Sequence, residues 1–241
     1  MCGRSSLTKT EKELEERFQA TFYSDGLVQY NPLPNFNVAP SHMMPVITNE
    51  DKLHFQAYRW GLIPFWAKDQ KIGYNMINAR IETLFEKSSF KMAVANRRCL
   101  VPADGFYEWK KIKGPDGKIT KQPYRIQTTD QEIFSMAGLW DRWKAPDGQT
   151  VFSFTVITQG PNETMKDIHD RMPAILTPEQ EALWLSDDLP PQELVDMIAP
   201  YPDENMKAYP VSPKIGNVRN NNVDLIAEHR PDLNDNELTL F

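Results

Sequence analysis

The sequence predicts an α+β fold, in which a curved, largely antiparallel, barrel-like sheet is accompanied by peripheral helices. Segments rich in β-branched and aromatic residues occur in pairs separated by Gly, Pro and Asp turn signals, which is the pattern of consecutive hairpins. Helix start signals lie outside these hairpins. No strand–helix alternation and no glycine-rich phosphate loop is present, so a parallel nucleotide-binding sheet is not expected.

The first expected element is a helix. Thr8-Lys-Thr-Glu11 has the spacing of a capping box, and Leu14 and Phe18 follow on one helical face. Residues 22–40 hold several turn formers, among them Asn31-Pro-Leu-Pro-Asn35, and are expected to form a loop.

Strands are expected through the middle of the chain, four of them in hairpins that turn at residues 114–117 and 145–148. The expected strands are 54–60, 97–103, 105–111, 123–128, 132–140 and 150–158. Thr177-Pro-Glu-Gln180 is a second capping box, with Pro at the first helical position, and begins a helix that runs to about Leu185. Another short helix is expected from Gln192 to Ala199.

The composition is that of a soluble globular protein. The chain has 241 residues, of which 40% are hydrophobic and 25% charged, and we expect one domain over residues 1–241 with an acidic tail from about residue 228. No apolar run approaches the roughly 20 residues that cross a bilayer. The N-terminus has no apolar signal region, so a cytoplasmic protein without a membrane partner is expected.

The cysteines and histidines argue against two kinds of site. Cys2 and Cys99 cannot build a disulfide framework. The four histidines and two cysteines show no metal-ligand spacing, so we expect no metal and no cofactor.

Charge is distributed unevenly along the chain. The formal net charge is -6, which by itself argues against a nucleic-acid binder. Residues 59–111, however, carry 10 Lys and Arg against 5 Asp and Glu, whereas residues 178–241 carry 4 against 13. A local polyanion site on an acidic protein would give this distribution, and so would chance clustering on a solvated surface.

Cys2 is the first candidate for chemistry. If Met1 is removed, Cys2 carries an α-amine with a pKa of about 8 and a thiol with a pKa of about 8.5. The amine can form a Schiff base with an aldehyde, and the thiol can then close a thiazolidine ring. The alternative, favoured on position alone, is an incidental second residue in a disordered tip.

Aromatic residues interleaved with Asn and Arg form the next motif. Trp60-Gly-Leu-Ile-Pro-Phe-Trp66 and the segment 75–83 combine groups that stack on bases with groups that hold phosphates. The alternative is a core aromatic cluster with a surface loop, and we expect Trp60 to be a core residue.

Two ionisable residues complete the candidates. Glu108 lies between aromatics in Gly105-Phe-Tyr-Glu-Trp109, where it could act as acid or base or be a half-exposed strand residue. His169, in His169-Asp-Arg-Met-Pro173, could move protons near neutral pH or be a hydrogen-bonded surface residue.

Together these motifs resemble the SRAP family, whose name stands for SOS response-associated peptidase. The resemblance runs from Cys2 to about Val218, and seven motifs in one order are far more specific than any one of them. The motifs are Cys2-Gly-Arg4, Asn37-Val-Ala-Pro40, Trp60 to Trp66, Asn78-Ala-Arg-Ile-Glu82, Arg97-Arg-Cys-Leu-Val-Pro102, Gly105 to Trp109 and His169 to Pro173.

The resemblance implies a DNA-damage protein, cytoplasmic and nucleoid-associated, that senses and shields abasic sites in single-stranded DNA. It implies a covalent thiazolidine at Cys2 after Met1 is removed, a basic cleft, weak lyase activity at abasic sites and peptidase-like removal of Met1. The acidic C-terminal quarter and the loop after Tyr23 have no counterpart in it.

The resemblance also implies roles for single residues. Cys2 matches the crosslinking residue, Asn78 would hold the N-terminal residue, Glu108 would take a proton from the ammonium, and His169 would exchange protons with the sugar oxygen. Arg80 and Arg171 match arginines that hold phosphates. The other DNA-lining residues implied are Arg4, Asn37, Pro40, Trp66 and Thr158.

Two other functions stay open at this point. An N-terminal-nucleophile amidohydrolase would also use Cys2, with its α-amine as base, but gives Glu108 and His169 no role. A non-covalent single-strand binder would use only the aromatics and arginines.

The C-terminal segment 236–241 suggests a protein partner. Its sequence, Asn-Glu-Leu-Thr-Leu-Phe, is similar to the peptides by which bacterial replication proteins hold the sliding clamp, with Glu237 where Gln is usual. Leu238, Leu240 and Phe241 would be the anchors, or else the tail folds back onto an apolar patch.

Overall fold

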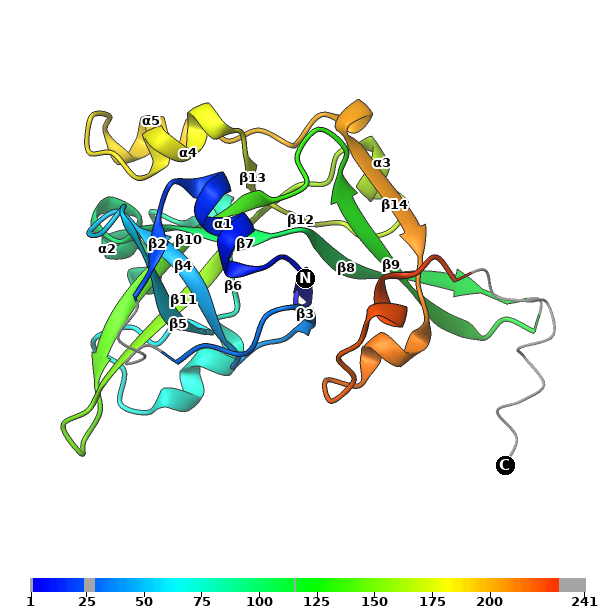
Figure 1. The fold of residues 1–241 in the computed structure, drawn as a ribbon, viewed down its shortest axis with the longest axis horizontal. Helices are drawn as coiled ribbons and strands as arrows, with labels where there is room; N and C mark the ends of the chain where they lie inside the picture. The colour runs from blue at the N-terminus through cyan, green and yellow to red at the C-terminus, as the bar shows by residue number, and fades with distance from the viewer. Residues whose placement is uncertain (1, 24–28, 115, 230–241) are drawn as a thin grey trace.

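A closed five-stranded barrel forms one half of the molecule. The computed structural model describes residues 2–23, 29–114 and 116–229 (Figure 1). The barrel strands are β4 (Met43–Thr48), β5 (His54–Trp60), β7 (Arg98–Ala103), β10 (Phe134–Lys144) and β11 (Thr150–Gln159). The barrel closes because β11 pairs with β10 on one side and with β5 on the other.

Most pairings in the barrel are antiparallel, as expected from consecutive hairpins. Among the barrel strands, only β5 and β11 run parallel, with Ser153 opposite Arg59. The predicted α+β class and the curved, barrel-like sheet are therefore confirmed. Four short strands add to the barrel edges: β2 (Thr21–Phe22), β6 (Asn78–Arg80), β12 (Met172–Pro173) and β13 (Ile175–Leu176).

A second sheet of five strands lies beside the barrel. Its order is β14-β9-β8-β1-β3, with β8 and β9 as the long predicted hairpin. The bounds are β1 (Ser5–Leu7), β3 (Asn35–Val38), β8 (Gly105–Lys113), β9 (Ile119–Thr128) and β14 (Met206–Pro210). Because β8 follows β7 after a single residue, the start of the chain is held where the two sheets meet (Figure 1).

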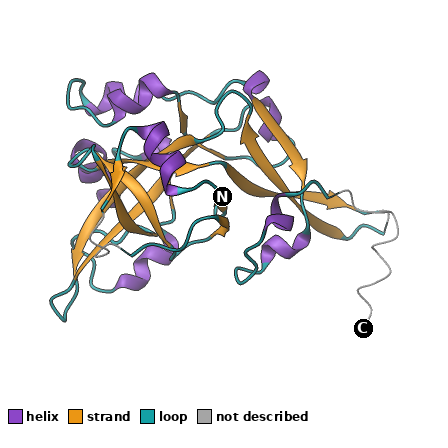
Figure 2. Cartoon of the chain, in the orientation of Figure 1, coloured by secondary structure: helices purple, strands orange, loops and turns teal. Residues whose placement is uncertain are grey.

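Helices lie at the periphery of both sheets (Figure 2). The α-helices are α1 (Glu11–Phe18), α2 (Ser88–Asn96), α3 (Glu163–Lys166), α4 (Pro178–Trp184) and α5 (Pro191–Asp196). The 3-10 helices are η1 (Gln70–Asn75), η2 (Ile81–Thr83), η3 (Asp203–Asn205), η4 (Pro213–Gly216) and η5 (Val223–Ile226). The predicted capping box and first-position Pro of α4 are confirmed.

The predicted start of the first helix is wrong by two residues. The capping box is formed by Thr10 and Glu13, not by Thr8 and Glu11. Both the amide and the hydroxyl of Thr8 bond instead to the buried carboxylate of Asp104. The Thr8 hydroxyl, which the local pattern assigned to the helix cap, is therefore used in a tertiary contact with Asp104.

The loop predicted over residues 22–40 is also partly wrong. Residues 35–38 form β3, which pairs with β1, and residue 22 ends β2. Asn35 and Val38 pair with Leu7 and Ser5, so part of the predicted loop becomes a strand through a partner that is distant in sequence. The segment 192–199, predicted as a helix, forms one only up to Asp196.

The barrel interior is tightly packed. Trp140, Phe154 and Trp184 are almost fully buried in one continuous cluster. Gly138 on β10 has no room for a side chain, because a Cβ there would lie 2.8 Å from Cys99 Sγ. Such packing fixes the barrel as a rigid support.

Some predictions fall on residues that are not described. Met1, residues 24–28 and residues 230–241, which include the clamp-like anchors and most of the acidic tail, lie outside the described residues. Within the described part of the chain, no helix is long and apolar enough to cross a membrane.

Candidate active site

The pairing of β1 with β8 places Cys2 beside Glu108. Ser5 is opposite Phe106, and the Tyr107 amide donates to the Arg4 carbonyl at 2.9 Å. Because the strands run antiparallel, the chain before Arg4 continues along β8 in the direction of Glu108. Cys2 is only 3% exposed, so the alternative of a disordered tip is wrong.

Asn78 reaches Cys2 from the barrel. β6 pairs in parallel with β11, and the Asn78 side-chain nitrogen donates to the Cys2 carbonyl at 2.9 Å. Its side-chain oxygen is buried and accepts no hydrogen bond from the described residues. Residue 2 is thereby fixed from two sheets at once, by strand pairing on one side and by an amide on the other.

Glu108 and His169 complete the cluster. Glu108 is 2% exposed, so the alternative of a half-exposed strand residue is wrong. Its Oε2 lies 3.7 Å from His169 Nε2, while His169 Nδ1 lies 3.1 Å from the Arg171 amide nitrogen and 2.9 Å from Asp170 Oδ1. Nδ1 therefore lies between an amide donor and a carboxylate acceptor, while Nε2 faces Glu108.

Burial and the neighbouring carboxylate act in the same direction on Cys2. Burial, followed by the charge of Glu108 and a hydrogen bond to it, raises the pKa of the Cys2 thiol well above its usual value. The thiol is therefore neutral near pH 7 in the chain that begins with Met1. The adjacent carboxylate is placed to receive the proton when the sulfur reacts.

Arg171 and Arg80 lie near this cluster, but Arg171 is held in an ion pair whereas Arg80 is exposed. The two terminal nitrogens of Arg171 bind Glu82 at 2.6 and 2.9 Å, and one of them also donates to the Thr158 carbonyl at 2.6 Å. Hydrogen bonding to Arg171 lowers the pKa of Glu82. Arg80, opposite Thr158 across β6 and β11, is exposed.

Glu82 is the residue that sequence reasoning missed. It stands in the quoted motif that begins at Asn78, but its partner Arg171 is 89 residues away. Only the pairing of β6 and β12 with opposite edges of β11 brings these segments together. In the sequence, the one available indication that Glu82 belongs to the site was its position two residues after Arg80 in the same motif.

Arg4 and Asn37 bond to each other and to backbone carbonyls of residues 215–220. The Asn37 side-chain nitrogen donates to the carbonyls of Ile215, Asn217 and Asn220, and its oxygen accepts from Arg4. Arg4 also donates to the carbonyls of Ile215 and Gly216.

Those contacts tie the start of the chain to the segment around η4. Pro40 is half-buried in the turn before His42, whose pKa is lowered by burial and by the charge of Arg4.

The two tryptophans of the aromatic motif differ. Trp60 is buried and stacks with Phe154, which confirms the expected core position. Trp66 is 46% exposed, and Phe65 and Tyr74 are more exposed still. Arg59 lies over the Tyr74 ring at 5.3 Å and Arg97 over the Phe65 ring at 5.9 Å, so each of these two exposed rings has a cation beside it.

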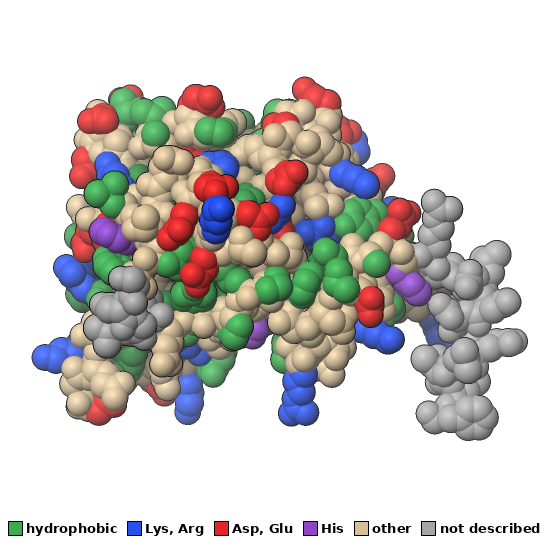
Figure 3. Space-filling view, viewed as in Figure 1, with side chains coloured by type: hydrophobic (Ala, Val, Ile, Leu, Met, Phe, Trp, Pro, Cys, Tyr) green, Lys and Arg blue, Asp and Glu red, His purple; other side chains and the backbone are tan. Residues whose placement is uncertain are grey.

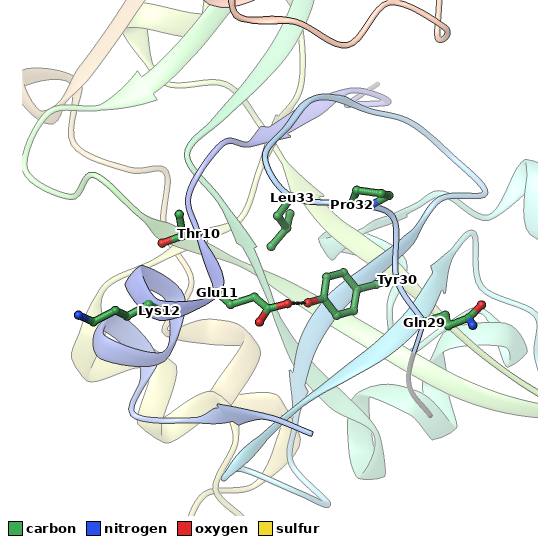
Figure 4. A pocket seen from close by; sticks show the side chains of 7 residues that line it. All are labelled: Thr10, Glu11, Lys12, Gln29, Tyr30, Pro32 and Leu33. Atoms are coloured by element: carbon green, nitrogen blue, oxygen red, sulfur yellow. Dashed lines mark hydrogen bonds between the residues drawn. The ribbon is translucent and has the colours of Figure 1, made fainter. Parts of the chain in front are cut away.

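Hollows on the surface do not coincide with the buried cluster. A hollow of about 760 Å³ lies between α1 and residues 29–33, where Tyr30 bonds to Glu11 (Figure 4). A second, of about 390 Å³, adjoins the cluster because His169 lines it together with Trp109 and Lys111. No group of three His, Cys, Asp or Glu side chains among the described residues could hold a metal ion.

Part of the acidic C-terminal quarter forms α4 and α5, where Figure 3 shows acidic side chains at the upper edge of the molecule. Another part of the same quarter, η4, contacts Arg4 near the start of the chain.

Comparisons with known proteins agree on one family. The chain matches the family described as SOS response associated peptidase (SRAP) over residues 1–218. It is 44% identical to the abasic site processing protein YoqW of Bacillus subtilis, over 95% of this chain and all of that protein. It is 32% identical to the abasic site processing protein HMCES of Mus musculus, over 94% of this chain and 76% of that protein.

A solved structure has the same fold. The crystal structure of a protein from Bacteroides thetaiotaomicron superposes with a TM-score of 0.77 at 32% identity, over 88% of this chain and 93% of that one. The buried Cys2 cluster, the closed barrel and these comparisons lead to one assignment: the chain belongs to the SRAP family.

Proposed function

We propose that this protein acts in the response to DNA damage by binding abasic sites in single-stranded DNA and linking to them through Cys2. The observation that carries the proposal is the convergence of Cys2, Asn78, Glu108 and His169 where the two sheets meet. The names of the relatives support abasic sites as the target.

The first step is formation of an imine. An abasic site in its ring-opened form presents an aldehyde, and the α-amine of Cys2 adds to that carbon with loss of one water molecule. In this proposal His169 gives a proton to the sugar oxygen as the ring opens, and Glu108 takes one from the ammonium. The distance of 3.7 Å between the two side chains supports a shared role. Asn78 keeps residue 2 in position by holding its carbonyl.

The second step closes the ring. The thiol of Cys2 adds to the imine carbon, a C–S bond forms, and the thiol proton passes by way of Glu108 to the imine nitrogen. Ring closure competes with β-elimination from the imine, which cuts the strand and accounts for a weak lyase activity.

Met1 must leave before either step. In the precursor the nitrogen of Cys2 belongs to a peptide bond, whose lone pair is delocalised and does not attack an aldehyde. Hydrolysis of the bond between Met1 and Cys2 produces the free amine, and the same Glu108 and His169 are in place to assist it. The buried oxygen of Asn78 can then accept a hydrogen bond from the new ammonium.

DNA is held by local charge rather than by net charge. Arg80 is exposed beside Asn78, and Trp66 offers an open aromatic face. A phosphate binds to an exposed arginine even on a protein with a net charge of -6, because the local field decides, and a base stacks on the tryptophan ring.

Mass spectrometry of the intact protein tests the proposal. With abasic single-stranded DNA, the chain that has lost Met1 should gain the mass of the DNA less one water and survive heating without borohydride. Cys2→Ala should lose this stable adduct but keep borohydride-trappable imine, since Ala also offers an α-amine. Cys99→Ala, which removes the other buried thiol, is the matched control and should react like the wild type.

The other two functions give different results in the same assays. An amidohydrolase would release ammonia from glutamine, and a non-covalent binder would give no adduct on a denaturing gel. A heat-stable, borohydride-independent adduct with Cys2→Ala would reject the proposed role of the thiol.

A further inference from the structure

The β8–β9 hairpin continues beyond Glu108 as a basic arm. Residues 110–122 contain five lysines and one described acidic residue, Asp116, on a protein whose net charge is -6. We call the following residues the lysine arm: Lys110, Lys111, Lys113, Lys118 and Lys121. Four of them are exposed, and Lys110 is half-buried.

The pairing within the arm places like charges against each other. Lys111 is directly opposite Lys121, so both side chains project from the same face of the hairpin. Among the described residues, only Lys118 of the arm has an ion pair, with Asp116 at 3.2 Å. Like charges directly opposite one another destabilise a hairpin, and a bound anion relieves that repulsion.

A hollow connects the arm to the Cys2 cluster. The hollow of about 390 Å³ is lined on one side by Trp109 and Lys111 of β8 and on the other by residues 166–170. His169 belongs to this lining and faces Glu108 at 3.7 Å. A DNA strand that leaves the Cys2 cluster through this hollow therefore meets Lys111 before the other lysines of the arm.

We propose that the lysine arm binds the phosphate backbone of the DNA that flanks the abasic site. This inference rests on the proposed function and extends the site along β8. At about 3.4 Å per residue, Lys111 lies roughly 10 Å and Lys113 roughly 17 Å beyond Glu108. At a rise of about 3.4 Å per nucleotide, these positions correspond to about three and five stacked nucleotides.

The test measures binding to DNA that carries a tetrahydrofuran abasic analogue, which has no aldehyde. Three probes are compared by fluorescence anisotropy: one with a single nucleotide on each side of the analogue, one with single-stranded flanks of about eight nucleotides, and one with duplex flanks. The variant is Lys111→Ala/Lys121→Ala. The control is Lys91→Ala/Lys144→Ala, two exposed lysines on α2 and β10.

The arm variant should bind the long-flank probe more weakly and with a smaller salt slope. For single strands, each lost phosphate contact reduces the slope of log Kd against log salt concentration by about 0.7, so two lost contacts reduce it by about 1.4. Between 1 M and 0.1 M salt, the arm variant should therefore gain about 25-fold less affinity than the wild type. The short probe should bind all three proteins equally, and the single-stranded and duplex flanks tell which form the arm holds. Lys111→Glu, which forms a cross-strand pair with Lys121 and so preserves the hairpin, changes the charge of the arm by the same two units and should weaken binding to a similar extent.

Equal slopes for wild type and both arm variants on both long probes would overturn the inference. The same loss in the control variant would overturn it too, because the effect would then be one of overall charge. Failure of the proposed function looks different: wild type would form no adduct with a true abasic site on any probe. If only the arm inference fails, wild type and arm variants form the adduct equally.

Discussion

Replacement of Glu108 by Gln should change the two reactivities of Cys2 in opposite directions. The charge of Glu108 and its hydrogen bond help to raise the pKa of the Cys2 thiol, and Gln removes the charge while keeping the shape. A neutral Gln no longer disfavours the thiolate by its charge, and each pKa unit that is lost corresponds to about 1.4 kcal/mol. The thiol pKa should therefore fall, although burial keeps it above its ordinary value.

A lower pKa makes the thiol easier to alkylate. Each unit increases the thiolate fraction about tenfold and reduces its intrinsic nucleophilicity by about threefold, so the alkylation rate at fixed pH should rise about threefold per unit. The profile of alkylation rate against pH should shift to lower pH. Adduct formation with abasic DNA should nevertheless slow, because the group that accepts the ammonium and thiol protons is lost.

Competitive alkylation with iodoacetamide, followed by peptide mass spectrometry, measures the first effect. Cys99 is the internal reference, since its pKa is raised by burial alone. The ratio of Cys2 to Cys99 labelling should increase in Glu108→Gln relative to wild type. An unchanged ratio would refute the electrostatic coupling, and unchanged adduct yield would refute the role of Glu108 as proton acceptor.

Five further variants probe the DNA contacts and the partner. Arg80→Ala and Arg171→Ala should each reduce the salt slope of single-strand binding by about 0.7, whereas Glu82→Gln should strengthen binding by releasing Arg171; equal slopes would exclude phosphate contacts. Trp66→Ala should cost about 1–3 kcal/mol of binding with an unchanged melting temperature, and loss of folding would assign Trp66 to packing. A chain that ends at Asn236 should no longer be retained by the sliding clamp of the same organism, and retention equal to that of the full chain would end that proposal.

The sequence by itself determined the elements that local chemistry specifies. The hairpins β8–β9 and β10–β11 followed from strand composition and from Pro-Asp-Gly turns, and α4 from its capping box and first-position Pro. These patterns need only neighbours in the chain, so they survive in any fold that contains them. The order of seven motifs also sufficed to indicate the family.

Tertiary structure alone decided how distant segments meet. Strands β1, β3 and β14 were not predicted from the sequence, and they form because β8 pairs with β1, β1 with β3, and β9 with β14, over long distances in the chain. The same pairing buries Cys2, which position alone would have left in a disordered tip. Thr8 shows the effect on one side chain: its hydroxyl bonds to Asp104 and is lost to the helix.

The site combines both kinds of information. The residue types at Cys2, Glu108 and His169 were visible as motifs, but their contacts were not, because they lie on segments separated by up to 167 positions that only the β1–β8 and β11–β12 pairings bring together. Glu82 remained hidden for the same reason, since an ion pair between residues 82 and 171 leaves no local pattern. Local propensity acts over a few residues, whereas burial and strand pairing act over the whole chain.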